Sequence, residues 1–412
     1  MKLERVLAVV WLVALVIPAS IGLAADWPQF RGINRDGISR EKGLLKQWPE
    51  GGPLLVKTIS DIGDGFSSPC VADGRVFITG MVNDRSKVFC FDLKGNLIWE
   101  KDNGPEFTGD RPGSRSTPTI EGNVIYCLSG MGRVAALSTK DGRELWSVSY
   151  VDGFKAEVPN WGFSESLLID RGHVICTPGG PDASIVALNK ETGETVWTSK
   201  GMSDKASYSH PMAIRFGGKR QILTLTQQSL VGVDANRGDF LWRYDRPCNK
   251  TANAATPLFK DGIVFAASAY RTGGGAAKLS KQGDRFVATE IWDTTDMQPH
   301  HGNYVYLDGY IYGNSDRNGW CCIELKTGKV MYKEQGVGKG SIIYADGMFY
   351  CLGEKGTMGL VVAGPEKHPV VSRFDLPNAA DSDNKAWAHP TISDGKMYLR
   401  CRDKLFIYNI KK

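Results

Sequence analysis

The sequence has few of the features that mark several common protein classes. Its charges nearly balance, with 50 Lys and Arg against 45 Asp and Glu, whereas a dedicated nucleic-acid binder would carry a clustered basic face. Helical periodicity is almost absent and no Gly-x-Ser-x-Gly elbow occurs, while the glycine-rich stretch 272–277 lacks the Gly-Lys-Ser/Thr of a phosphate-binding loop. The 48 glycines instead favour many short strands joined by tight turns.

The apolar run at 6–17 is too short to span a bilayer comfortably. It follows basic residues and precedes small residues that end at Ala24 and Ala25. This order predicts a cleaved export signal over 1–25, with an uncleaved N-terminal anchor as the alternative. The first cysteine is Cys70, which disfavours a lipoprotein. We expect a periplasmic or secreted protein with no transmembrane segment after signal cleavage.

Nine cysteines in an exported protein suggest disulfides, but their positions favour free thiols. Cys127, Cys176 and Cys351 follow comparable hydrophobic strand openings. Equivalent positions on sheets packed face to face lie about 10 Å apart, too far for a sulfur–sulfur bond. We therefore expect small buried thiols in a β core, and the odd count leaves at least one cysteine unpaired.

One motif recurs along the chain: the end of a strand, a polar turn with a glycine, and a second strand that ends on an aromatic residue. The glycine allows a positive φ without a Cβ clash, and the terminal Trp can bury its ring against the neighbouring unit while its N–H finds a backbone partner. The copies, of which the last two are looser or shorter, lie at 136–146, 187–197, 232–242, 322–332 and 90–99.

A short strand followed by a glycine turn also recurs about every 40–50 residues, the length of a four-stranded propeller blade. About eight such units occur, and the last, 387–412, stops after its third strand. A strand near Val56 supplies the missing fourth. The sequence therefore predicts an all-β fold, with one domain over 26–412. We expect an eight-bladed β-propeller of four-stranded antiparallel blades, closed by N- and C-terminal strand exchange around an empty hub.

The repeated Ala-Leu-x-x-x-Thr-Gly-x-x-x-Trp unit resembles the tryptophan-docking repeat of quinoprotein alcohol dehydrogenases and their non-catalytic relatives. These relatives include the BamB-type propeller of outer-membrane assembly. The whole chain resembles exported bacterial propellers with pyrroloquinoline-quinone-like (PQQ-like) repeats. The features that carry this likeness are Asp26-Trp-Pro-Gln-Phe-Arg-Gly32, His300-His-Gly302, Gly338-Lys-Gly-Ser341 and Trp387-Ala-His-Pro390. The resemblance implies the fold and leaves the activity open, because function depends on the site.

Candidate site residues stand just before the first strand of each unit. Because the first strand of a propeller blade is innermost, these residues should meet at one mouth of the central channel. We predict a binding site there, and the alternative is a polar channel mouth without a ligand. The candidates are Arg115, Trp161, Glu165, His210, Asn253, His300, His301, Lys339, Trp387 and His389.

A shared metal among these histidines is disfavoured on geometry. His210 and His389 belong to units on opposite sides of the ring, so we expect that they cannot meet across the channel. His300 and His301 are adjacent, and in an extended strand they would point to opposite faces. We predict no metal site.

The competing hypothesis is a PQQ-dependent dehydrogenase of alcohols or sugars. The resemblance implies that such an enzyme needs a calcium bound by oxygen ligands, an aspartate base and a vicinal disulfide. Cys321-Cys322 lies in a predicted strand, where alternation places the sulfurs on opposite faces. Near the channel the acids are Glu165, Asp293 and Asp296, and they form no calcium-binding trio. We predict no PQQ, no calcium and no catalytic residues.

The sequence thus favours an exported, non-catalytic binding or scaffold protein. Its loops and channel mouth would bind a protein, peptide or glycan partner in the cell envelope, and nucleic acid is not expected as a partner. We expect a monomer.

Overall fold

The computed structural model describes residues 26–316, 319–367, 369–377 and 385–412. The predicted export signal over 1–25 lies outside these residues. Within them, strands dominate, and the helix α1 (Tyr150–Phe154) has five residues. No helix in the described part is long and apolar enough to cross a membrane.

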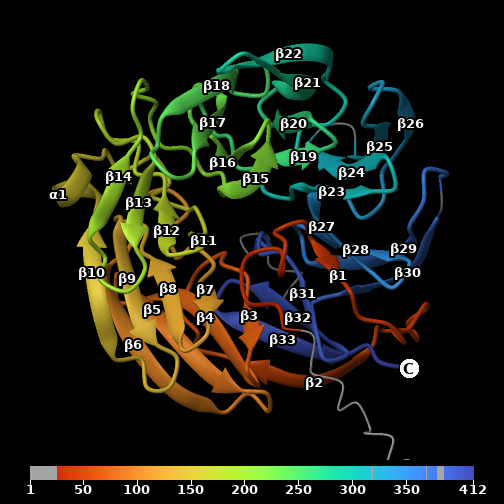
Figure 1. Cartoon of the computed structure of the whole chain (residues 1–412). Coiled ribbons are helices and arrows are strands. Elements are labelled where there is room, and N and C mark those ends of the chain that lie inside the picture. The colour runs from red at the N-terminus through yellow and green to blue at the C-terminus, as the bar shows by residue number, and fades with distance from the viewer. Residues whose placement is uncertain (1–25, 317–318, 368, 378–384) are drawn as a thin grey trace, which may run out of the picture.

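The described strands form eight sheets arranged in a ring, which confirms the predicted propeller (Figure 1). We number the blades in chain order from the sheet that begins at Cys70. Blade 1 consists of β3 (Cys70–Ala72), β4 (Arg75–Val82), β5 (Arg85–Asp92) and β6 (Leu97–Pro105), and blade 2 of β7 (Thr119–Glu121), β8 (Val124–Leu128), β9 (Arg133–Ser138) and β10 (Glu144–Ser149). Blade 3 consists of β11 (Leu168–Asp170), β12 (His173–Cys176), β13 (Val186–Asn189) and β14 (Thr195–Thr198), and blade 4 of β15 (Met212–Phe216), β16 (Lys219–Leu225), β17 (Leu230–Asp234) and β18 (Phe240–Tyr244).

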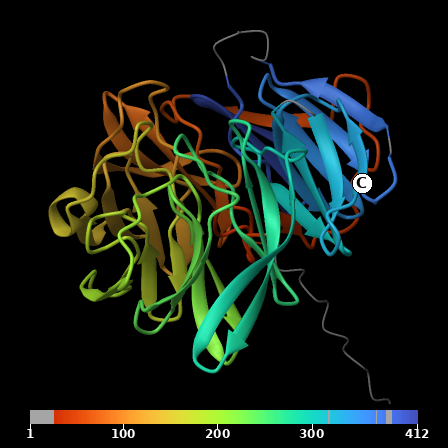
Figure 2. The same ribbon diagram turned by 90° about the horizontal axis from the view of Figure 1, so that it is seen from above.

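The second half of the ring follows the same plan. Blade 5 consists of β19 (Leu258–Lys260), β20 (Ile263–Ser268), β21 (Gly273–Gln282) and β22 (Arg285–Thr294), and blade 6 of β23 (Tyr304–Leu307), β24 (Tyr310–Ser315), β25 (Gly319–Glu324) and β26 (Val330–Glu334). Blade 7 contains β27 (Gly340–Ala345), β28 (Met348–Gly353), β29 (Thr357–Val362) and β30 (Val370–Asp375), and blade 8 consists of β31 (Thr391–Ser393), β32 (Lys396–Cys401), β33 (Lys404–Asn409) and the N-terminal β2 (Leu54–Ile59). The long β21–β22 hairpin of blade 5 extends past its neighbours on one side of the ring (Figure 2).

The repeated tryptophan joins blades 1, 2, 3 and 5 to the blade that follows each of them, as predicted. In blade 2, the Trp146 indole N–H donates to the Lys190 carbonyl in the turn of blade 3, at 2.9 Å. The glycine of that turn, Gly193, has a φ of +76°, and a Cβ there would lie 2.6 Å from the Trp146 ring. The glycine is therefore required both by its backbone conformation and by the close approach of the neighbouring indole.

The ring closes through the predicted strand exchange. Strand β2 pairs antiparallel with β33, with Leu54 opposite Asn409 and Ile59 opposite Leu405. The order β2-β33-β32-β31 makes the N-terminal strand the outer strand of blade 8. This pairing ties the two ends of the described chain into one sheet.

The hub is filled, so the prediction of an empty hub is wrong. Residues 26–37, which we call the plug, run from blade 1 to blade 7. Trp27 bridges to Val71 of β3, and the plug leads into β1 (Ile38–Ser39), which pairs in parallel with β27. Blade 7 thus has five strands, whereas four were expected.

Two buried arginines of the plug hold the inner strands together. The Arg31 guanidinium donates to the carbonyl oxygens of Tyr304 in blade 6, at 2.5 Å, and of Ile342 in blade 7, at 3.4 Å. Arg35 donates to the carbonyl oxygens of Ser166 and Pro211, which precede blades 3 and 4. Guanidinium groups suit this position because their five donors can satisfy carbonyls that would otherwise be buried without partners.

All nine cysteines are free, in agreement with the predicted thiols. Cys321 and Cys322 lie next to each other in β25. Cys321 packs in the core shared with blade 5, whereas Cys322 packs in the core shared with blade 7. Strand alternation therefore separates the two sulfurs, as expected.

Candidate functional site

A cavity of about 350 Å³ opens at one mouth of the channel, and we call it the mouth pocket. Most of its walls are loops that precede innermost strands. The innermost strands contact one another around the hub, as in β3 against β7 and β23 against β27, and this brings the loops together. The lining residues are Phe30, Phe66, Asp110, Arg111, Arg115, Trp161, Ser164, Tyr208, His210, Ala252, Ala254, Tyr270, His300, His301, Trp387 and His389.

Seven of the ten candidate residues line this pocket. They come from the segments before blades 2, 3, 4, 6 and 8, which lie far apart in the sequence. The seven are Arg115, Trp161, His210, His300, His301, Trp387 and His389. Most residues chosen for their position before an inner strand therefore line one pocket, and their binding role stays a prediction.

Glu165 does not line the mouth pocket. Its carboxylate accepts hydrogen bonds from the Tyr150 hydroxyl, at 2.6 Å, and from the Thr177 backbone N–H, at 2.7 Å. The Thr177 hydroxyl donates as well. Burial raises the pKa of Glu165, and these donors oppose the rise. The residue joins α1 to blade 3 and has a structural role.

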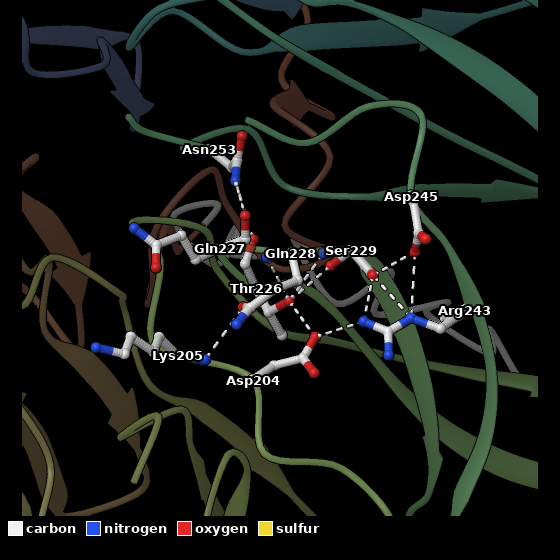
Figure 3. A network of polar contacts seen from close by, with 9 residues as sticks. All are labelled: Asp204, Lys205, Thr226, Gln227, Gln228, Ser229, Arg243, Asp245 and Asn253. Atoms are coloured by element: carbon white, nitrogen blue, oxygen red, sulfur yellow. Dashed lines mark hydrogen bonds and ion pairs between the residues drawn. The ribbon is translucent and has the colours of Figure 1, made fainter. Parts of the chain in front are cut away.

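Asn253 also lies outside the pocket lining, in the polar network of Figure 3. Its amide donates to the carbonyl oxygen of Thr226, at 3.0 Å, and to that of Asn249, at 2.9 Å. The Thr226 hydroxyl in turn donates to Asp204, which pairs with Arg243 at 3.0 Å. Asn253 thus fixes the loops of blades 4 and 5 beside the mouth.

Lys339 is the third candidate outside the lining. Its ammonium pairs with Asp316 at 3.0 Å and with Glu354 at 3.7 Å. Its charge also lowers the pKa of His301, after the larger effects of burial and of His300.

The floor of the pocket is Phe30 of the plug. Its ring centroid lies 3.9 Å from that of His210 and 4.9 Å from that of His389. The two histidines were expected to be kept apart by the width of the channel. Instead they pack on the same phenylalanine, because the plug fills the hub between them.

The hydrogen bonds of His389 are those of a neutral ring. Its Nε2 lies 2.9 Å from the His301 carbonyl oxygen, to which only an N–H can donate. Its Nδ1 lies 3.4 Å from an Arg31 nitrogen, and arginine can only donate. Burial, followed by the Arg31 charge, lowers the pKa of His389 to about 3.

The two adjacent histidines share the pocket, which corrects the prediction that they point apart. Nδ1 of His300 lies 3.4 Å from Nδ1 of His301, and Nε2 of His300 lies 2.8 Å from the Tyr270 hydroxyl. The expectation failed because these residues lie in the loop between β22 and β23, where strand alternation does not apply. Burial lowers the pKa of His300 to about 4.

Arg115 is the most enclosed cation of the lining. It donates to the backbone carbonyls of Gly113 and Arg111, and its guanidinium lies 5.1 Å from the centroid of Phe66. No carboxylate of the described residues lies within ion-pair distance of it. Burial lowers the pKa of Arg115 to about 10, so it remains charged at neutral pH.

Nine lining residues were not among the ten candidates: Phe30, Phe66, Asp110, Arg111, Ser164, Tyr208, Ala252, Ala254 and Tyr270. The only signal for Phe30 was a stretch dense in aromatic and charged residues that lacks a strand pattern. Tyr270 lies in the turn between β20 and β21, with a φ of +58°, whereas the candidates all precede the first strand of a blade.

The lining does not fit the calcium and quinone arrangement of the dehydrogenases. Asp110 is its one carboxylate, and this group accepts a hydrogen bond from the Trp161 indole at 3.1 Å. Asp293 pairs with Arg246 at 2.8 Å, outside the pocket. Among the described residues there is also no group of three His, Cys, Asp or Glu side chains that could hold a metal ion. Calcium prefers six to eight oxygen ligands, which this lining does not supply.

Comparisons with known proteins point to one superfamily. A family model described as "Outer membrane protein assembly factor BamB" matches residues 47–158 and 84–334. The chain is 28% identical over 213 residues to the outer membrane protein assembly factor BamB of Kangiella koreensis, covering 50% of this chain and 48% of that protein. It is 27% identical over 213 residues to the quinoprotein alcohol dehydrogenase PedH of Pseudomonas putida, covering 48% of this chain and 32% of that enzyme.

Solved structures show the same fold. BamB from Moraxella catarrhalis superposes with a TM-score of 0.60 at 15% identity, covering 87% of this chain and 98% of that one. The quinohemoprotein alcohol dehydrogenase of Comamonas testosteroni gives a TM-score of 0.65 at 13% identity, covering 94% of this chain and 81% of the enzyme. At these identities the likeness concerns the fold alone.

The aligned segments span about half of the Kangiella BamB and about a third of PedH, so neither match carries the activity of the whole relative. The family model, in contrast, covers more than half of this chain. The chain therefore belongs to the family described as outer membrane protein assembly factor BamB, among the propellers built from PQQ-like repeats.

Proposed function

We propose that this protein is a non-catalytic binding protein of the cell envelope, which recognises a partner at the mouth pocket. The observation that carries the proposal is the convergence of loops from seven blades on one cavity of about 350 Å³, with Phe30 of the plug in its lining. Pockets of this size with aromatic walls and a few polar groups are typical of ligand sites. The lining offers no paired carboxylates for acid–base chemistry, which favours binding over catalysis.

The envelope location is part of the same proposal. It is supported by the export signal that the sequence predicts and by the outer-membrane assembly named for the BamB relatives. In this location, the exposed rim of the pocket is available to a polypeptide or glycan of the envelope.

The proposal can be tested by photo-crosslinking in envelopes of the source organism. A photoreactive phenylalanine analogue is placed at Tyr270 on the rim, which is 41% exposed, or at Ile291 on the outer strand β22, which is 43% exposed. We expect a discrete crosslinked partner from position 270 and none from position 291. Equal crosslinking from both positions, or none from position 270, would contradict the proposal.

The dehydrogenase hypothesis has a separate test. The purified protein is titrated with PQQ and calcium while absorbance and dye reduction with alcohols or sugars are followed. We expect neither stoichiometric uptake nor turnover, and turnover would replace the binding proposal with an enzymatic one.

A further inference from the structure

We infer that the mouth pocket binds a small cyclic carboxylate, with the carboxylate at Arg115 and the ring among the aromatic walls. The inference rests on the proposed function and names the chemical class of ligand. It depends on the charge of the lining, on the unused donors of two side chains, and on the aromatic walls and the plug that bound the cavity.

The charge of the lining favours one negative charge on the ligand. The lining contains two guanidinium groups, Arg111 and Arg115, and one carboxylate, Asp110. Asp110 lies 3.9 Å from Arg111 in an exposed pair. Arg115 therefore remains as the enclosed cation that a ligand could neutralise, and pairing a desolvated charge is favourable.

The acid whose charge acts most on Arg115 does not pair with it directly. The Glu106 carboxylate raises the pKa of Arg115 through its charge, but its oxygens accept hydrogen bonds from the Ser114 hydroxyl, at 2.5 Å, and from the Gly130 N–H, at 2.6 Å. Arg115 itself uses two of its five N–H groups on backbone carbonyls. The others are available for a planar carboxylate, whose two oxygens match the guanidinium fork.

A second donor lies in the segment before blade 6. His301 Nε2 is buried and has no hydrogen-bond partner among the described residues. When the Tyr270 hydroxyl donates to Nε2 of His300, the ring proton of His300 is on Nδ1, which can donate to Nδ1 of His301. The ring proton of a neutral His301 is then on Nε2. Because Arg115 precedes blade 2 and His301 precedes blade 6, the inference places the two donors toward different ends of a ligand. The second end should therefore carry a hydrogen-bond acceptor.

Aromatic side chains form much of the wall between these donors. Trp161 and Tyr208 pack with ring centroids 5.8 Å apart, and Trp387 packs against Phe66 at 4.8 Å. Such walls favour flat or ring-shaped bodies over flexible chains. Hydroxylated aromatic acids and sugar acids both have a ring, a carboxylate and a distal oxygen.

The plug makes the cavity blind. Phe30 closes it from below, and a separate cavity of about 240 Å³ beyond the plug is lined by Arg31 and Arg35. The ligand thus enters and leaves by the mouth alone, and its length is limited by the depth of the pocket.

Calorimetric titration of the full protein with matched ligand pairs tests the inference. The pairs are 4-hydroxybenzoate with 4-hydroxybenzamide, and glucuronate with glucose. In at least one pair we expect the carboxylate to bind about tenfold or more tightly than its neutral partner, as for a hydrogen-bonded charge. The pair that shows the difference identifies the ligand as an aromatic acid or a sugar acid.

Arg115→Gln should reduce the difference in affinity between the carboxylate and its neutral partner to about twofold or less. The matched control is Arg171→Gln in the turn between β11 and β12, where the side chain contacts Asn236, and it should retain the full preference. The wild-type comparison tests the inference even if Arg115→Gln fails to fold.

Equal binding of both members of each pair, no binding of either carboxylate, or an equal effect of the control would overturn the inference. The crosslinking at position 270 is independent of these probes. A partner captured there without carboxylate binding would refute the ligand class and leave the proposed function standing.

Discussion

Phe30 of the N-terminal plug packs on His210 of the segment before blade 4, with ring centroids 3.9 Å apart and the planes inclined by 31°. These residues are 180 positions apart in the sequence numbering, and their contact places the plug across the channel beneath the mouth pocket. The plug thereby acts in two ways. Its arginines link the inner strands, and its phenylalanine forms the surface on which a ligand would rest.

Removing the floor should weaken the whole ring. Phe30 is 6% exposed, and Phe30→Ala should lower the free energy of unfolding by about 3 kcal/mol, the lower end for a buried phenylalanine because the new space joins an existing pocket. Urea denaturation measures this change. The control is Ile33→Ala in the same segment, where the side chain is 53% exposed and the change should stay below about 0.5 kcal/mol. Equal effects would show that the plug does not pack as described.

The buried histidines should make the protein sensitive to acid. Burial holds the pKa of His389 at about 3, below the usual value near 6.5, so the folded state favours the neutral ring. The stability from this preference is fully present above pH 6.5, and it is lost as the pH falls toward 3. The free energy of unfolding should fall by about 1.4 kcal/mol per pH unit for each such histidine in this window.

His389→Gln tests that assignment, since glutamine does not titrate. The slope of unfolding free energy against pH between 6 and 4 should become smaller by about 1.4 kcal/mol per pH unit. Tyr304→Phe is the control, because it removes the hydrogen bond to the Thr256 carbonyl at 2.7 Å but no group that titrates in this range. It should lower stability at every pH without changing the slope. An unchanged slope for His389→Gln would mean that the ring is charged in the folded protein.

The parts of the fold that depend on local pattern could be predicted from the sequence. The Gly and Trp of each repeat lie a few residues apart, and they define a turn and the strand that follows it. The mouth residues were found in the same way, from their place before each inner strand. The adjacent histidines were misjudged because a loop between β22 and β23 does not follow strand alternation.

The plug could not be predicted by the same reasoning. Arg31 bonds to the Ile342 carbonyl, which is 311 residues away, and a backbone carbonyl leaves no signature in the sequence. A short irregular segment gives no periodic pattern either. Only the assembled ring shows that buried carbonyls at the hub require donors, and that two guanidinium groups supply them.

The tryptophan docking can be separated from simple backbone strain. Gly193→Ala would place a methyl group 2.6 Å from the Trp146 ring, at a φ of +76°. Gly122 has a φ of +56° but nothing within 4 Å of its would-be Cβ, so Gly122→Ala measures the backbone cost alone, about 1 kcal/mol. Gly193→Ala should lower the free energy of unfolding by at least about 1 kcal/mol more than Gly122→Ala does, as is typical of overpacking. Equal shifts in denaturant midpoint would show that the indole does not lie on the turn.

The closure of the ring should depend on a buried side chain of β2. Ile59 in β2 is 6% exposed and packs with Leu405 and Ile407 of β33, whereas Val56 in the same strand is 51% exposed. Ile59→Ala should therefore lower the free energy of unfolding by about 2–4 kcal/mol, and Val56→Ala by less than about 0.5 kcal/mol. Because β2 holds the N-terminal segment to blade 8, hydrogen exchange in β33 should also become faster in Ile59→Ala. Unchanged exchange in β33, with normal stability, would mean that the ring closes without this strand.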